Sequence, residues 1–94
     1  HHADDVFTSW GKETPHKYTR EGIENILKKF CNTEEYGTIL RAKGMVPAED
    51  GTWIYFDMVP GEYEIREGEP DYTGRIVVIG TEIHEDELLK TFGL

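Results

Sequence analysis

The chain has 94 residues, with 10 Lys or Arg against 19 Asp or Glu, which gives a formal net charge of −9. This length fits one domain with a modest core, too small to enclose a deep catalytic cavity, and the negative charge argues against nucleic acid as a partner, because phosphates repel it. The sequence has no apolar run long enough for a membrane span and no signal peptide, and its lone Cys31 suits a reducing compartment, so we expect a soluble cytoplasmic domain.

The first residues have the character of a linker. We interpret residues 1–5 as a linker or tag remnant and residues 6–94 as one domain. His1 and His2 are either the end of a purification tag or the tail of a native His-rich segment that would bind metal. The sequence alone leaves both interpretations open.

The N-terminal part of the domain predicts a strand, a loop and a helix. Val6–Trp10 alternates as a strand does, and Gly11–Lys17 is expected to be a loop because it contains Gly and Pro. Apolar residues then recur at the spacing of one helix face over Arg20–Cys31. Thr19 is the predicted N-cap of this helix.

The rest of the chain predicts four strands and a closing helix. Two turn signals, at Asp50-Gly51 and Pro60-Gly61, favour hairpins between neighbouring antiparallel strands. The last strand is apolar on both faces, which is typical of a central strand. The predicted strands are Thr38–Val46, Thr52–Val59, Glu62–Arg66 and Arg75–Gly80, and the helix is Glu85–Phe92.

These elements follow in the order β-α-β-β-β-β-α. Each helix has a single apolar stripe, and one sheet face can bury both stripes. We therefore expect an α+β fold, a two-layer sandwich with a mainly antiparallel sheet and two helices on one face.

Motifs for catalysis are missing from the sequence. It contains no GxxxxGK[ST] phosphate loop, no GxSxG nucleophile elbow and no HExxH zinc motif. We assign no catalytic residue and expect that this chain is not an enzyme.

Metal binding is a weaker alternative. A structural zinc site needs four ligands at suitable spacing, usually Cys and His, and the imidazoles do not show such spacing. A surface site could combine His1, His2 and His84 with acidic neighbours. Alternatively, His84 simply occupies the N-cap position of the last helix.

Two neighbouring strands carry the candidate interaction surface. Arg41 and Lys43 project from one face of their strand, with Ile39 and Met45, whereas Leu40, Ala42, Gly44 and Val46 face the other way. Such cations could hold a phosphate, a carboxylate or an acidic partner loop, or simply pair with nearby carboxylates. Trp53, Tyr55 and Asp57 share one face of the next strand, where exposed aromatic side chains would form a docking surface.

The segments, taken together, resemble the C-terminal domain of the CobW family of P-loop GTPases. The resemblance covers about residues 6–94 and depends on the order and spacing of several motifs. They are Phe7-Thr8-Ser9-Trp10 with Glu13-Thr14, the helix from Thr19-Arg20-Glu21 to Phe30, Arg41-Ala42-Lys43-Gly44, Trp53-Ile54-Tyr55-Phe56-Asp57, Val59-Pro60-Gly61, Gly74-Arg75 through Ile79-Gly80, and Leu88, Leu89 and Phe92. His84 departs from the family, whose members often have Asp before the last helix.

The resemblance implies a role beside a GTPase domain. The family's nucleotide and metal motifs lie in its N-terminal domain, so we expect no cofactor in this chain, and GTP, Mg and zinc or cobalt in the parent protein. The implied function is a non-catalytic interaction or regulatory domain in metal delivery or cobalamin synthesis. Its partners would be the N-terminal GTPase domain and a metalloprotein client. The alternative is a freestanding small metal-binding protein that uses His1, His2 and His84.

Overall fold

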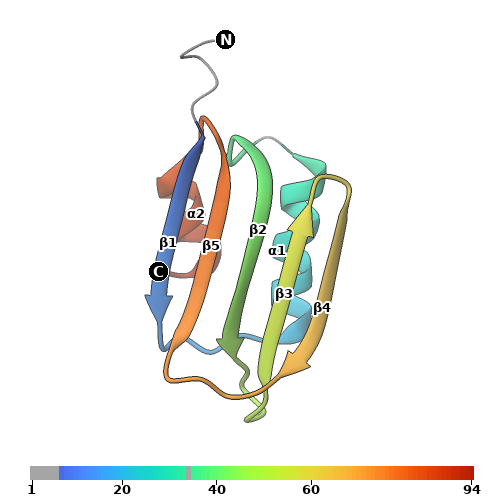
Figure 1. The fold of residues 1–94 in the computed structure, drawn as a ribbon, viewed down its shortest axis with the longest axis vertical. Helices are drawn as coiled ribbons and strands as arrows, with labels where there is room; N and C mark the ends of the chain where they lie inside the picture. Colours follow the sequence, from blue (N-terminus) through green and yellow to red (C-terminus); the bar gives the residue numbers. More distant parts are fainter. Residues whose placement is uncertain (1–6, 34) are drawn as a thin grey trace.

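The computed structural model describes residues 7–33 and 35–94. It confirms the predicted α+β sandwich, since five strands form one sheet and both helices lie on the same face of it (Figure 1). Neighbouring strands are antiparallel throughout. The elements are β1 Thr8–Thr14, α1 Arg20–Asn32, β2 Thr38–Pro47, β3 Trp53–Val59, β4 Glu62–Gly68, β5 Gly74–Thr81 and α2 Glu85–Phe92.

The strand order in the sheet is β1-β5-β2-β3-β4. The predicted hairpins β2–β3 and β3–β4 are confirmed, because each pair is joined at the turn that the sequence indicated. Strand β5 is the last strand in the sequence but lies between β1 and β2, which explains why it is apolar on both faces. Three inner strands, β5, β2 and β3, are therefore paired on both edges.

The first strand differs from the prediction. A strand was expected over Val6–Trp10 and a loop over Gly11–Lys17, but β1 continues to Thr14. The exposed polar residues Lys12 and Glu13 belong to the strand because they pair with Ile76 and Arg75 of β5. On an edge strand, exposed polar positions weaken the alternation that predicts a strand.

Both helices begin and end close to the predicted positions. The Thr19 side chain accepts a 2.9 Å hydrogen bond from the Gly22 backbone N–H, which confirms the predicted cap of α1. His84 occupies the N-cap position of α2, but its side chain makes no capping bond there. No helix among residues 7–33 and 35–94 is long and apolar enough to cross a membrane.

An aromatic cluster joins α2 to the rest of the core. The Phe92 ring is 1% exposed and lies 6.0 Å from the rings of Trp10 and Phe30, between centroids. The Tyr18 hydroxyl donates a 2.6 Å hydrogen bond to the Phe92 carbonyl, and burial raises the pKa of Tyr18 to about 12. These contacts hold the C-terminal helix against β1 at one side of the sheet.

A β-bulge in β2 changes the predicted orientation of Ile39. Ile39 pairs with Gly80 but Arg41 pairs with Ile79, so Leu40 is an extra residue in β2. Ile39 is 5% exposed and lies in the core, although strict alternation placed it on the same face as Arg41. The extra residue shifts the alternation by one, because in a bulge two residues of one strand lie opposite a single residue of the partner strand.

Candidate functional site

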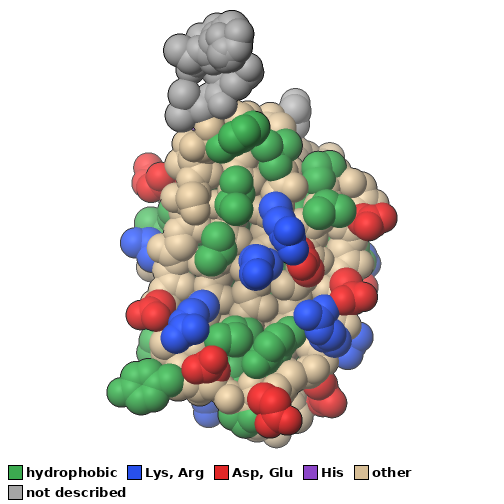
Figure 2. Space-filling model, viewed as in Figure 1, with side chains coloured by type: hydrophobic (Ala, Val, Ile, Leu, Met, Phe, Trp, Pro, Cys, Tyr) green, Lys and Arg blue, Asp and Glu red, His purple; other side chains and the backbone are tan. Residues whose placement is uncertain are grey.

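The sheet face that carries no helix is the candidate site. In β3, Ile54, Phe56 and Met58 are buried beneath the helices, so the alternating residues point to the opposite side. We call that side, across all five strands, the open face. Figure 2 views it from the front, with Lys and Arg side chains over the middle of the sheet and hydrophobic side chains above and below them.

The structure brings the five predicted surface residues together. They all lie on the open face, on the adjacent strands β2 and β3. Arg41 and Lys43 are exposed, and the other three are half-buried. Their part in an interaction remains a prediction. The five residues are Arg41, Lys43, Trp53, Tyr55 and Asp57.

An ion pair fixes one side of this group. The Arg41 guanidinium donates a 2.8 Å hydrogen bond to Asp57 Oδ2. The directly opposite partner of Asp57 in the strand pairing is Lys43, so Arg41 reaches Asp57 diagonally. The other oxygen, Asp57 Oδ1, is buried and has no hydrogen-bond partner among the described residues. Asp57 therefore sits between two cations, with one oxygen still able to accept.

The Tyr55 ring is held flat across β4. Tyr55 pairs with Arg66 of the neighbouring strand, and its ring reaches diagonally to Gly68, where its atoms occupy the space that a Cβ would fill. The Tyr55 hydroxyl donates a 2.7 Å hydrogen bond to the Glu69 carbonyl. The aromatic ring thus presents one fixed surface on the open face.

Gly44 supports the same region from beneath. A Cβ at this position would lie 2.5 Å from the Arg75 carbonyl oxygen and 2.7 Å from Cζ of Phe56. The glycine that follows Lys43 therefore allows the Phe56 ring and β5 to approach β2 closely, as expected for Gly within a strand. Its role is structural, and it sets how the open-face side chains above it are spaced.

The charges of the open face differ from those of the whole chain. Its three inner strands carry the cations Arg41, Lys43 and Arg75, and the carboxylate of Asp57. The full chain, by contrast, has 19 acidic and 10 basic residues. The middle of the sheet is therefore a positive region on a negative protein.

A hollow of about 370 Å³ opens in this positive region. Sequence reasoning did not assign Arg66, Arg75 and Val77 to the site. Strand β5 comes beside β2 only through the sheet order, and the predicted β3–β4 hairpin did not specify which β4 side chain lies opposite Tyr55. Arg66 and Arg75 face the hollow from β4 and β5, on either side of Tyr55 and Met45. We call this cavity the open-face hollow. Its lining includes Lys43, Met45, Tyr55, Arg66, Arg75 and Val77.

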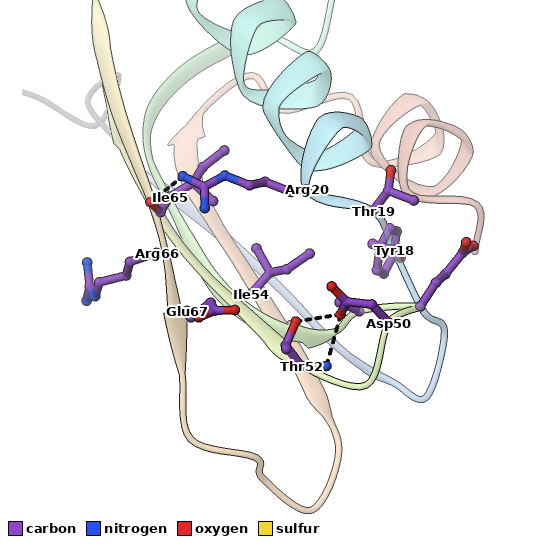
Figure 3. Close-up of a pocket in the computed structure, with 11 residues that line it drawn as sticks. Tyr18, Thr19, Arg20, Asp50, Thr52, Ile54, Ile65, Arg66 and Glu67 are labelled. Atoms are coloured by element: carbon purple, nitrogen blue, oxygen red, sulfur yellow. Dashed lines mark hydrogen bonds between the residues drawn. The ribbon is translucent and has the colours of Figure 1, made fainter.

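A second hollow, of about 420 Å³, lies between the start of α1 and strand β4 (Figure 3). Several of its polar groups are already engaged in hydrogen bonds. Arg20 donates to the Ile65 carbonyl, and Asp50 accepts from both the backbone N–H and the hydroxyl of Thr52. The Thr52 hydrogen bonds hold the pKa of Asp50 below its usual range. These bonds anchor α1 to β4 and close the β2–β3 turn.

Of the three predicted metal ligands, the structure describes only His84. His1 and His2 lie outside the described residues. His84 Nδ1 lies 2.7 Å from the Glu35 carbonyl oxygen, which engages one of its two ring nitrogens. Within residues 7–33 and 35–94, no three His, Cys, Asp or Glu side chains are placed to hold a metal ion.

Comparisons with known proteins agree on the fold. The chain superposes on the crystal structure of Zn(II)-bound YjiA GTPase from E. coli with a TM-score of 0.76 and 19% identity. A Zn(II)-bound triple mutant of YjiA GTPase gives the same values. Each superposition covers 93% of this chain and 29% of the YjiA chain. No curated protein sequence matches the chain significantly.

A family model gives the stronger statement. The model described as the cobalamin synthesis protein cobW C-terminal domain matches residues 7–93, nearly the whole chain. The matched range includes both helices and all five strands, in agreement with the resemblance drawn from the motifs. The chain therefore belongs to the CobW C-terminal domain family.

Proposed function

We propose that this chain is a non-catalytic interaction domain of a CobW-like GTPase, and that its open face docks against the GTPase domain or a client protein. The observation that carries the proposal is the open face itself. Half-buried aromatic side chains and exposed cations share one sheet surface that neither helix covers, at Trp53, Tyr55, Arg41 and Lys43. Protein interfaces are enriched in aromatic residues and Arg.

The parent protein would supply the chemistry. The chain has no phosphate-loop motif, and it covers less than a third of the YjiA GTPase chain. We propose that the parent binds GTP with Mg and handles zinc or cobalt, in metal delivery or cobalamin synthesis. This domain would then couple the nucleotide state to contact with a metalloprotein client in the cytoplasm. The chain alone is expected to hydrolyse no GTP.

The test is a binding measurement between this chain and the GTPase domain of its parent, and between this chain and a client. The variant is the double substitution Arg41→Ala with Lys43→Ala, and the readout is the dissociation constant from calorimetry. Both side chains are exposed, so the variant is expected to keep its fold. Binding to at least one partner should weaken by about tenfold or more, the usual effect of losing one or two interface anchors.

A matched control keeps the change of charge the same. Lys12→Ala with Lys28→Ala also removes two exposed cations, from β1 and α1, outside both hollows described above. This control should bind as the unmodified chain does. Equal affinity of the Arg41/Lys43 variant and the unmodified chain for both partners would refute the open face as the docking surface.

A further inference from the structure

The open-face hollow has a composition that points to a particular kind of partner. Its floor is made of Met45, Tyr55 and Val77, and these side chains are half-buried. Cations stand around the floor on three strands, at Lys43 and at two arginines. A surface of this kind combines a contact area for an apolar side chain with positive charges for an acidic one.

Lys43 is the cation best placed to receive a new partner. It lies on the middle strand of the sheet, opposite Asp57 on one side and Val77 on the other. Among the described residues it forms no ion pair, and Asp57 opposite it is bonded to Arg41 through Oδ2. Its ammonium group therefore remains available for a carboxylate from another molecule.

The two arginines flank the floor without converging on one point. Arg66 pairs with Glu64 on its own strand, and Arg75 pairs with Glu13 on β1, at the other side of the hollow. The two backbone positions are three strands apart, which is about 14 Å at the usual strand spacing. These ion pairs are at least half exposed and weak, so a partner carboxylate can replace them at little cost.

We propose that the open-face hollow binds an acidic segment of a protein partner, in which a carboxylate side chain meets Lys43 and a neighbouring apolar side chain packs on Tyr55 and Met45. The inference rests on the function proposed above and names the chemistry that the open face recognises. Spread cations around an apolar floor suit a peptide better than a single small anion, which needs donors that converge on it.

The geometry of β2 fits such a segment. Lys43 and Met45 are two residues apart on the same face, about 7 Å along the strand. An extended peptide places every second side chain on one side with the same spacing. Alternating acidic and apolar side chains on that side of a partner could therefore meet Lys43 and the floor together.

The experiment uses a fluorescein-labelled peptide that carries glutamate and leucine in turn at every second position, with serine at the positions between, so that both side chains face the same side. The peptide is titrated with this chain and followed by anisotropy. Chemical shifts of the ¹⁵N-labelled chain locate the binding. Saturable binding is expected, with shifts concentrated at Lys43, Met45, Tyr55 and Val77. Lys43→Gln should weaken the affinity by about tenfold, the effect of one lost charge-assisted hydrogen bond. Lys28→Gln, the same change at an exposed lysine on α1, should leave the affinity unchanged.

Several results would overturn the inference. One is a peptide with glutamine in place of glutamate that binds equally well, and another is the absence of any saturable binding by the acidic peptide. A third is full displacement of the peptide by millimolar inorganic phosphate with the same shifts, which would make the hollow a small-anion site. If the peptide fails but the Arg41/Lys43 double variant still loses its protein partner, the proposed function stands and only this inference falls. If the peptide binds but that double variant binds both partners normally, the proposed function falls.

Discussion

Arg41 on β2 and Asp57 on β3 are joined by a 2.8 Å hydrogen bond across the open face. Their side chains are 48% and 34% exposed, so water screens the pair. A double-mutant cycle with Arg41→Ala and Asp57→Ala, measured by urea unfolding, should give a coupling free energy of only about 0.2–1 kcal/mol. A value well above this range would mean that Arg41 serves the fold, and would weaken its assignment to an interaction surface.

Gly44 should tolerate no side chain. Gly44→Ala places a Cβ against the Phe56 ring and the Arg75 carbonyl oxygen, so the unfolding free energy should fall by about 1–3 kcal/mol, as for other overpacked cores. Gly11→Ala is the matched control on β1, because the nearest atom to its new Cβ lies 3.7 Å away. Denaturant unfolding of the two variants checks this, and equal stabilities would contradict the close approach of β2, β3 and β5.

Gly68 should control the position of the Tyr55 ring. Gly68→Ala forces the ring away from β4 and breaks the hydrogen bond from its hydroxyl to the Glu69 carbonyl. The expected result is a large change in the Tyr55 ring proton shifts, with weaker binding of the acidic peptide. Tyr55→Phe removes the hydroxyl and keeps the ring, so it should keep most of that binding. Unchanged ring shifts in Gly68→Ala would refute the stacked arrangement.

Tyr18 should make the fold sensitive to alkaline pH. Burial raises its pKa from 10.0 to about 12, so its contribution to stability is complete below pH 10. Between pH 10 and about 12 the unfolded chain loses this proton while the folded chain keeps it, and the unfolding free energy therefore falls. The unfolding free energy of the Tyr18→Phe variant should fall less steeply over this window, as measured by urea unfolding at several pH values. Tyr72 is 96% exposed, so Tyr72→Phe should keep the pH dependence of the unfolding free energy of the unmodified chain. The same pH dependence in Tyr18→Phe as in the unmodified chain would contradict the account.

Local pattern was enough to predict most of the fold. The helix stripes, the Thr19 cap and the two hairpin turns depend on residues close in sequence, and the structure confirms each of them. The prediction failed where pairing between distant segments decides the outcome. The polar second half of β1 becomes a strand only because β5 lies beside it, and the bulge at Leu40 turns Ile39 into the core.

The candidate site shows the same limit. Alternation within each strand was sufficient to place Arg41 with Lys43 and Tyr55 with Asp57, and the observed register of β2 with β3 brings the two pairs to one face. Alternation could not show that Arg75 borders the same hollow. Strand β5 lies beside β2 in the sheet, but β3 and β4 separate the two strands in the sequence. Nor could alternation show which face the helices leave open, since both faces of β3 are bulky.

The most direct test of the central claim is an NMR map of the partner's footprint. The ¹⁵N-labelled chain is mixed with the GTPase domain of its parent, and with a client in a second sample, and the amide shift changes are followed. The account predicts that, for at least one partner, the changes gather on β2, β3 and β5, around Lys43, Tyr55 and Val77. Changes confined to α1 and α2 with both partners would place the interface on the helical side and contradict the assignment of the open face.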